Sequence, residues 1–139
     1  MLDEKQLSDL LISISNRIGS SVEYLPKVEP RFLNETPYIL ITKTGYTFGL
    51  IEKGHTCFEE HDLGQDELIY RVFKLISYDV FSEKLRNREV SYDDGFDIQR
   101  EKRFKFQIEF LGKVNPIYIS RITKEIEEIL SKYPYQEIK

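Results

Sequence analysis

The sequence predicts a single α+β domain in which an N-terminal helix precedes a three-stranded antiparallel β-meander, and three C-terminal helices pack on the sheet. Two observations predict this class. Apolar residues recur with a helical period near the start of the chain and through its second half, whereas the period between them is two. The length of 139 residues suits one domain, residues 1–139, and the 40% of hydrophobic residues supply one core.

The N-terminal helix is predicted from one apolar stripe that follows Asp3. The stripe consists of Leu7, Leu10, Leu11, Ile14 and Ile18. Gly19 is placed to end this helix, because glycine adopts the left-handed conformation that closes many helices. Residues 20–37 contain three prolines and show no clear period, so we expect an extended connector with little regular structure there.

Three strands are predicted next, at residues 38–43, 46–52 and 55–60, because these segments are rich in β-branched and aromatic residues. Thr44-Gly45 and Lys53-Gly54 supply the turns between them. Connections this short allow only antiparallel pairing of the three strands.

Three helices are predicted in the second half of the chain. The first covers about residues 66–85, and carboxylates at its start interact favourably with the free N–H groups of the first turn. A polar loop leads to a helix over about residues 98–111, which Gly112 is expected to close. Asn115-Pro116 then favours a new helix start, and Pro134 requires that last helix to end before it.

Charge and composition exclude several classes of protein. Residues 1–69 carry 6 Lys or Arg and 12 Asp or Glu, whereas residues 70–139 carry 14 and 12, and the pI is about 5.3. This balance argues against a nucleic-acid partner, because such binding needs cations that neutralise phosphates. The charged, amphipathic N-terminus and the lack of a long apolar run predict a cytoplasmic protein without a membrane partner. The single cysteine, Cys57, excludes an intrachain disulfide.

Segment 55–61 is the candidate for metal and catalytic chemistry, because an extended strand would project His55, Cys57, Glu59 and His61 to one side. Residues two apart on a strand are separated by about 7 Å, whereas zinc ligands converge within about 2.3 Å of the ion. We therefore predict no metal and no cofactor, with His55, Cys57 and His61 as the candidates if a metal is bound. No nucleophile or phosphate-binding motif is present, so no catalytic residue and no enzymatic activity are predicted.

Two polar groups are candidates for contacts with a protein partner. Glu59, Glu60 and Asp62 begin an acidic run that continues through Asp66 and Glu67, with only His61 as a nearby cation in sequence. These acids either serve the following helix and solvent or form an electrostatic docking surface for a basic partner. The second group, a loop segment that combines an aromatic ring with acids, consists of Tyr92, Asp93 and Asp94.

A structural polar network is predicted between two of the C-terminal helices. Arg103 and Gln107 are four residues apart on one helix face, from which they would reach Glu67 or Tyr70 on the preceding helix. The basic run around Arg103 is interrupted by acidic and aromatic residues, which favours a solvated face over phosphate binding.

The helical half also resembles the bacterial immunity protein 63 family over about residues 62–135. The likeness lies in four motifs: Asp66-Glu67-Leu68-x-Tyr70-x-x-Phe73, then Arg103-x-x-x-Gln107-x-x-x-Leu111-Gly112, then Asn115-Pro116, and finally Glu125-Ile126-x-x-Ile129-Leu130-x-x-x-Pro134-Tyr135. Members of this family are small cytoplasmic proteins of polymorphic toxin systems. The resemblance implies a partner, a cognate toxin protein such as a nuclease, that is neutralised by stoichiometric occlusion. It brings no catalytic residue with it.

Two other functions remain open from the sequence. A regulatory or adaptor module that binds a protein unrelated to toxins would have the same composition, and gene neighbourhood separates it from an immunity protein. A metalloenzyme would retain about one equivalent of metal after purification and lose it when His55 and His61 are replaced. The identity of the toxin, its affinity and the oligomeric state do not follow from the sequence.

Overall fold

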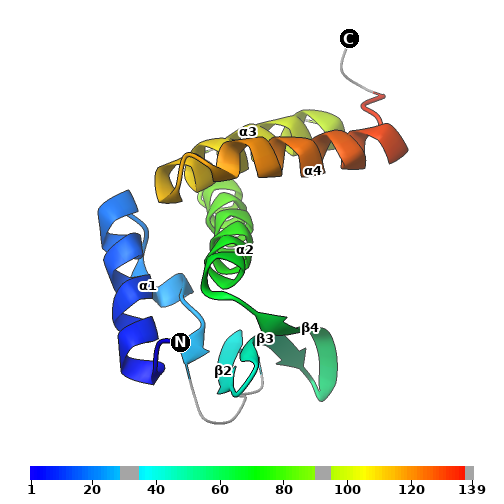
Figure 1. Ribbon diagram of the computed structural model, residues 1–139. Helices are drawn as coiled ribbons and strands as arrows, with labels where there is room; N and C mark the ends of the chain where they lie inside the picture. The colour runs from blue at the N-terminus through cyan, green and yellow to red at the C-terminus, as the bar shows by residue number, and fades with distance from the viewer. Residues whose placement is uncertain (29–34, 90–94, 137–139) are drawn as a thin grey trace. The chain divides into compact units, whose positions relative to one another are not determined.

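The computed structural model describes residues 1–28, 35–89 and 95–136, and the chain divides into two compact units, residues 1–72 and 73–139 (Figure 1). In chain order the elements are α1 (Glu4–Ile18), the 3-10 helix η1 (Val22–Tyr24), β1 (Lys27–Val28), β2 (Tyr38–Thr42), β3 (Gly45–Glu52), β4 (His55–Leu63), α2 (Gln65–Arg86), α3 (Phe96–Val114) and α4 (Tyr118–Lys132). Helix α2 begins in the first unit and continues into the second. The α+β class is therefore confirmed.

Helix α1 begins and ends where the sequence predicts. Asp3 and Gln6 form a capping box, in which the Gln6 amide donates to Asp3 Oδ1 at 2.8 Å and the Asp3 amide donates to Gln6 Oε1 at 3.0 Å. Gly19 closes the helix in the left-handed conformation, at φ 75°. The apolar stripe is buried at Leu7 and Leu11, which are 0% and 1% exposed.

The sheet has four strands in the order β1-β2-β3-β4, rather than the predicted three. Strand β1 lies in the segment that we expected to be an irregular connector, and it pairs parallel to β2, with Lys27 opposite Tyr38. The Lys27 amide donates to the Pro37 carbonyl at 3.0 Å. A two-residue strand has no detectable period, and its parallel partner is reached only through the long connection that follows it, so the sequence pattern did not reveal it.

The antiparallel part of the sheet, β2-β3-β4, agrees with the predicted meander. Ile39, Tyr46 and Phe48 share one face of this sheet by register and are at most 2% exposed. Gly45 was expected in the turn but begins β3, at φ 150°. A Cβ there would lie 2.8 Å from the Leu63 carbonyl oxygen, so the close approach of β4 requires glycine at this position.

In the second unit, α3 and α4 lie side by side (Figure 1) and also contact the C-terminal part of α2. The ring centroids of Phe81 on α2 and Phe106 on α3 are 5.8 Å apart. Lys74 on α2 forms an ion pair with Glu125 on α4 at 2.8 Å. The helix layout therefore differs in detail from the prediction, because the C-terminal part of α2, α3 and α4 contact one another within the second unit.

Gly112 was expected to close α3, but the helix continues to Val114. A Cβ at Gly112 would lie 2.9 Å from Cδ1 of Ile119 on α4, so glycine here permits close helix packing instead of ending the helix. Asn115 follows α3, and its Oδ1 accepts from the Ile117 amide at 3.1 Å, but α4 begins at Tyr118, so Asn115-Pro116 forms the turn before the helix rather than its first residues.

Candidate interaction surface on strand β4

Strand β4 is an edge strand of the sheet, and nearly all of its side chains are exposed or half-buried. It begins at a two-residue turn in which Lys53 and Gly54 both have positive φ, 51° and 77°, as a type I′ hairpin requires. It ends at Leu63, where the chain passes through Gly64 into α2. The turn at one end and the connection to α2 at the other therefore anchor β4, and its side chains form a row along the sheet edge.

Two register shifts change the alternation of side chains along β4. Phe58 pairs with Leu50 and Thr56 pairs with Ile51, so Cys57 is an extra residue between them. Because this bulge reverses the alternation, His55 lies on the opposite face of the sheet from Glu59 and His61. The expectation that one face would carry all four residues of the 55–61 pattern is therefore wrong.

This reversal bears on the metal candidates His55, Cys57 and His61. Among the residues that the structure describes, no group of three or more His, Cys, Asp or Glu side chains is arranged to hold a metal ion. Cys57 is exposed, and desolvation together with the nearby Glu52 carboxylate raises the pKa of its thiol. A raised pKa leaves less of the thiolate that serves as metal ligand and nucleophile.

Glu59 and His61 belong to a chain of four polar side chains on β2, β3 and β4. The Tyr38 hydroxyl donates to Glu59 Oε2 at 2.6 Å, and His61 Nε2 lies 2.9 Å from Glu59 Oε1. Thr47 Oγ1 lies 3.2 Å from His61 Nδ1. Burial, followed by the hydrogen bond to Glu59, raises the pKa of Tyr38 to about 12, because both disfavour the charged phenolate.

The order of Thr47, His61 and Glu59 in this chain resembles a nucleophile, a base and an orienting acid. Thr47, however, is only 4% exposed, so its hydroxyl is not open to an external substrate. The four residues therefore fix the directions of Glu59 and His61 at the surface, and a structural role explains their geometry.

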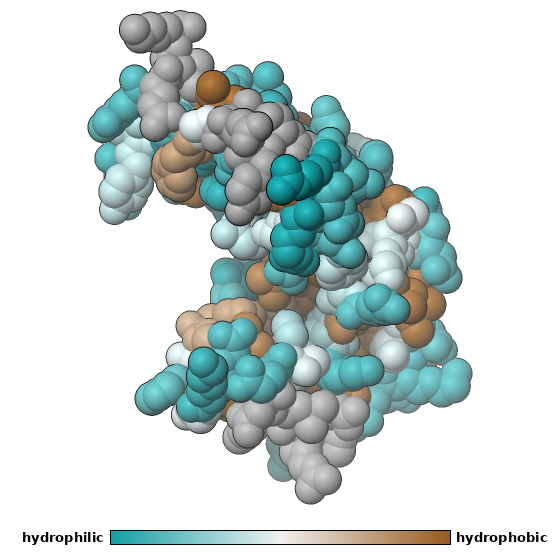
Figure 2. Space-filling model, turned by 180° about the vertical axis from the view of Figure 1, so that it is seen from behind, coloured by the Kyte–Doolittle hydropathy of each residue, from teal (hydrophilic) through white to brown (hydrophobic). Residues whose placement is uncertain are grey.

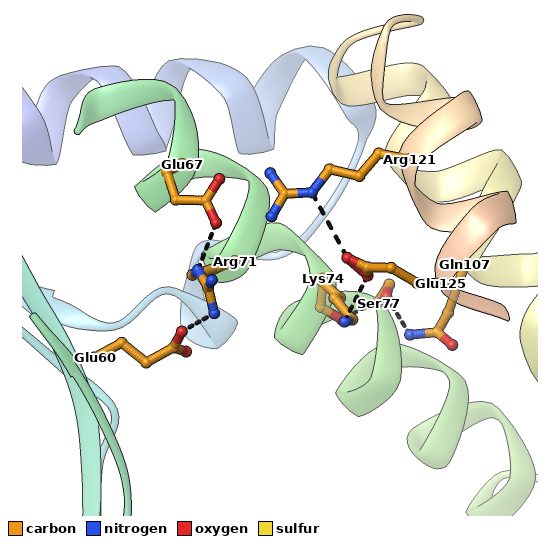
Figure 3. Close-up of polar contacts among 8 residues, drawn as sticks. All are labelled: Glu60, Glu67, Arg71, Lys74, Ser77, Gln107, Arg121 and Glu125. Carbon is orange, nitrogen blue, oxygen red and sulfur yellow. Dashed lines mark hydrogen bonds and ion pairs between the residues drawn. The ribbon is translucent and has the colours of Figure 1, made fainter. Parts of the chain in front are cut away.

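The other acids of the predicted docking surface also have partners within the first unit. Arg71 forms ion pairs with Glu60 and with Glu67, the latter at 2.7 Å (Figure 3). Asp62, at φ 57°, accepts from the Thr44 hydroxyl at 2.5 Å. The sequence pattern predicted only His61 as a cation near these acids. It missed Arg71, although the spacing of four residues from Glu67 on a helix is the signal that would have found it.

The residues of the predicted polar network are divided between the two units. Glu67 pairs with Arg71, and Tyr70 is buried, with 1% of its surface exposed. In the second unit, Gln107 Nε2 donates to the Ser77 hydroxyl at 3.1 Å (Figure 3). Arg103 lies against aromatic rings of that unit. A contact between these two groups of residues stays a prediction.

Tyr92, Asp93 and Asp94 lie outside the described residues, so their place in a docking surface also stays a prediction. Within the described part of the chain, no helix has the length and apolar character needed to cross a bilayer.

Comparison with known families shows which family this chain belongs to. The family model of immunity protein 63 matches residues 42–128, which is more than half of the sequence. The chain belongs to the immunity protein 63 family. The immunity protein 63 match includes β3, β4, α2 and α3, so it contains the acidic strand as well as the helical motifs of residues 62–128. No curated protein and no solved structure matches this chain significantly.

Proposed function

We propose that this chain is an immunity protein that binds a cognate bacterial toxin domain and neutralises it by stoichiometric occlusion. The observation that carries the proposal is the match to the immunity protein 63 family over residues 42–128. Occlusion needs a preformed surface and complementary charge rather than reactive groups.

We further propose that Glu59, Glu60 and Asp62 on β4 are part of the toxin-binding surface, together with the 92–94 segment. Each of the three β4 acids has a described partner. Glu59 contacts Tyr38 and His61, Glu60 pairs with Arg71, and Asp62 accepts from Thr44. Side chains that are already oriented lose less conformational entropy on binding than free ones. Glu59 and Glu60 pair with Gly49 and Phe48 and so lie on opposite faces of the sheet, but both belong to its edge strand. Acids along this edge suit a basic partner, and the substrate cleft of a nuclease toxin is positively charged.

Figure 2 supports recognition by mixed polar and apolar contacts. The residues in view are mostly hydrophilic, with separate brown apolar patches among teal residues. A partner that met such a surface would depend on charge for orientation and on a few apolar anchors for affinity.

The proposed function is tested by co-expression with the product of the adjacent gene. We expect growth to be rescued from a toxin encoded there, and a one-to-one complex to be recovered. Absence of rescue together with a stable complex of another kind would favour the adaptor interpretation.

The docking surface has a separate test. Replacing Glu59, Glu60 and Asp62 by lysine should slow association with the toxin by roughly tenfold or more at low salt, because steering depends on the sign of the charge. Glu109→Lys, Glu127→Lys and Glu128→Lys, at exposed positions of α3 and α4, reverse the same number of charges and are the matched control. An association rate that is unchanged in the β4 variant, or equally reduced in the control, would contradict this surface and leave the immunity function standing.

A further inference from the structure

The second unit contains a small pocket between the C-terminal part of α2 and the first turns of α3. Its volume is about 70 Å³, enough for two or three water-sized groups. The lining combines aromatic, aliphatic and polar side chains, namely Tyr78, Phe81, Ser82, Leu85, Phe96, Gln99, Arg100 and Arg103. Tyr78 and Phe96 are 47% and 71% exposed, so two aromatic rings stand in contact with solvent beside the pocket.

Arg103 is the unusual member of this lining. Its guanidinium carbon lies 5.2 Å from the centroid of the Tyr78 ring and 5.1 Å from that of Phe104. Its Nε atom, like that of Arg100, is buried without a hydrogen-bond partner among the described residues, but unlike Arg100 it pairs with no carboxylate among them. Burial lowers the pKa of Arg103, and the charge of Arg100 contributes in the same direction, but a guanidinium still carries its charge at neutral pH.

Arg100 provides the contrast within the same pocket. Its guanidinium pairs with Asp97 at 3.2 Å, and both side chains are less than one-tenth exposed. Asp97 also accepts from the Gln136 amide at 2.6 Å. Among the described residues, buried Arg100 is thus compensated by an internal carboxylate, whereas half-buried Arg103 lies against aromatic rings without one, which is costly for a cation.

We propose that this pocket binds a carboxylate side chain, Asp or Glu, of the protein partner, with Arg103 as its cation and Tyr78 and Phe96 as flanking contacts. The proposal rests on the immunity function, because it assigns the pocket to the toxin. An incoming carboxylate would accept charge-assisted hydrogen bonds from the guanidinium fork and supply the missing opposite charge. Exposed aromatic residues next to an arginine are also typical of residues that dominate binding energy.

The same observations favour a carboxylate over a phosphate-rich partner. The pocket is small, and its second arginine is already paired with Asp97. The whole chain carries a net charge of −4, which opposes approach of a polyanion. A single acidic side chain on a protein loop needs only one free guanidinium and one shallow pocket.

The ligand class is tested on the intact protein with small probes. We would follow the Arg103 Nε–Hε signal by nuclear magnetic resonance, assigned by comparison with Arg103→Lys, during millimolar titrations of N-acetyl-glutamate methylamide. The neutral glutamine analogue and inorganic phosphate are the comparison probes. A saturable change with the glutamate probe alone is expected. No response, or an equal response to the glutamine analogue, would overturn the proposal, and tighter phosphate binding would assign a phosphoryl ligand instead.

The role in partner binding is tested with the toxin. Arg103→Gln should weaken the complex by roughly tenfold or more, because a charge-assisted hydrogen bond is lost. Lys105→Gln, an exposed residue on the same helix, makes the same charge change outside the pocket and should have little effect. Equal losses in both variants would overturn the docking role. If no toxin is bound at all, the proposed function fails, whereas the probe titration of the wild-type chain still decides the pocket.

Discussion

Replacing Gly49 by alanine should destabilise the protein through Tyr38. Gly49 lies opposite Tyr38 in the β2-β3 ladder, and the tyrosine ring crosses the space where a side chain would be. A Cβ at Gly49 would be 2.5 Å from the Tyr38 hydroxyl oxygen, 2.7 Å from its Cζ and 3.0 Å from the Phe58 carbonyl oxygen. Tyr38 is fully buried, so its ring has no free space into which to move.

The expected change in the free energy of unfolding combines two destabilising effects and one stabilising effect. Overpacking a buried site costs about 1–3 kcal/mol. Displacing the Tyr38 hydroxyl from Glu59 adds about 1 kcal/mol, because that carboxylate is one-third exposed and water partly replaces the donor. Alanine gains about 0.4–1 kcal/mol by restricting the unfolded chain. The expected net loss in the free energy of unfolding is about 2 kcal/mol.

Urea unfolding followed by circular dichroism measures this loss, with Gly64→Ala as the control because a Cβ there meets nothing within 4 Å. The decisive comparison repeats Gly49→Ala in a Tyr38→Leu background. If the clash with the ring is the cause, the loss should fall by at least about 1 kcal/mol in that background. Equal losses in both backgrounds would refute the reasoning.

Three further predictions concern titration and buried polar contacts. The pKa of Tyr38 is about 12 in the folded protein, against an ordinary value of 10.0 for the unfolded chain. The contribution of this shift to stability should therefore be complete below pH 10 and be lost as pH rises toward 12. Tyr38→Phe should flatten this part of a curve of unfolding free energy against pH. Ser77→Ala should cost about 1–3 kcal/mol in urea unfolding because it leaves buried Gln107 Nε2 without its acceptor, whereas Gln107→Leu should cost less because the Ser77 hydroxyl still donates to the Lys74 carbonyl at 2.6 Å; the double variant should lose less than the sum of the two. Cys57 should react with iodoacetamide more slowly at pH 8 than a free cysteine, and Glu52→Gln should accelerate it.

The features that the sequence predicted well are those that local interactions determine. Asp3, Gly19 and the apolar stripe between them are sufficient to define α1, because capping and amphipathicity act within a few residues. The type I′ turn at Lys53-Gly54 likewise depends on two adjacent residues.

The features that the sequence did not predict depend on residues distant along the chain. Gly112 resembles a helix terminator, and only the side chain of Ile119 on α4 shows that its role is close packing. Strand β1 exists through its pairing with β2. The side of the sheet that His55 occupies depends on a bulge, and one extra residue in a strand reverses every assignment beyond it.

The pairing of the β4 acids changes how their variants should be interpreted. Glu59→Lys removes a hydrogen bond from Tyr38 as well as reversing a charge, so a weaker complex alone would not identify steering. The two effects separate kinetically, because steering acts on the association rate over about a Debye length and is screened by salt, whereas a disturbed contact surface acts on the dissociation rate and is not. A change confined to association and abolished at high salt is therefore the result that would assign these acids to long-range attraction of a basic partner.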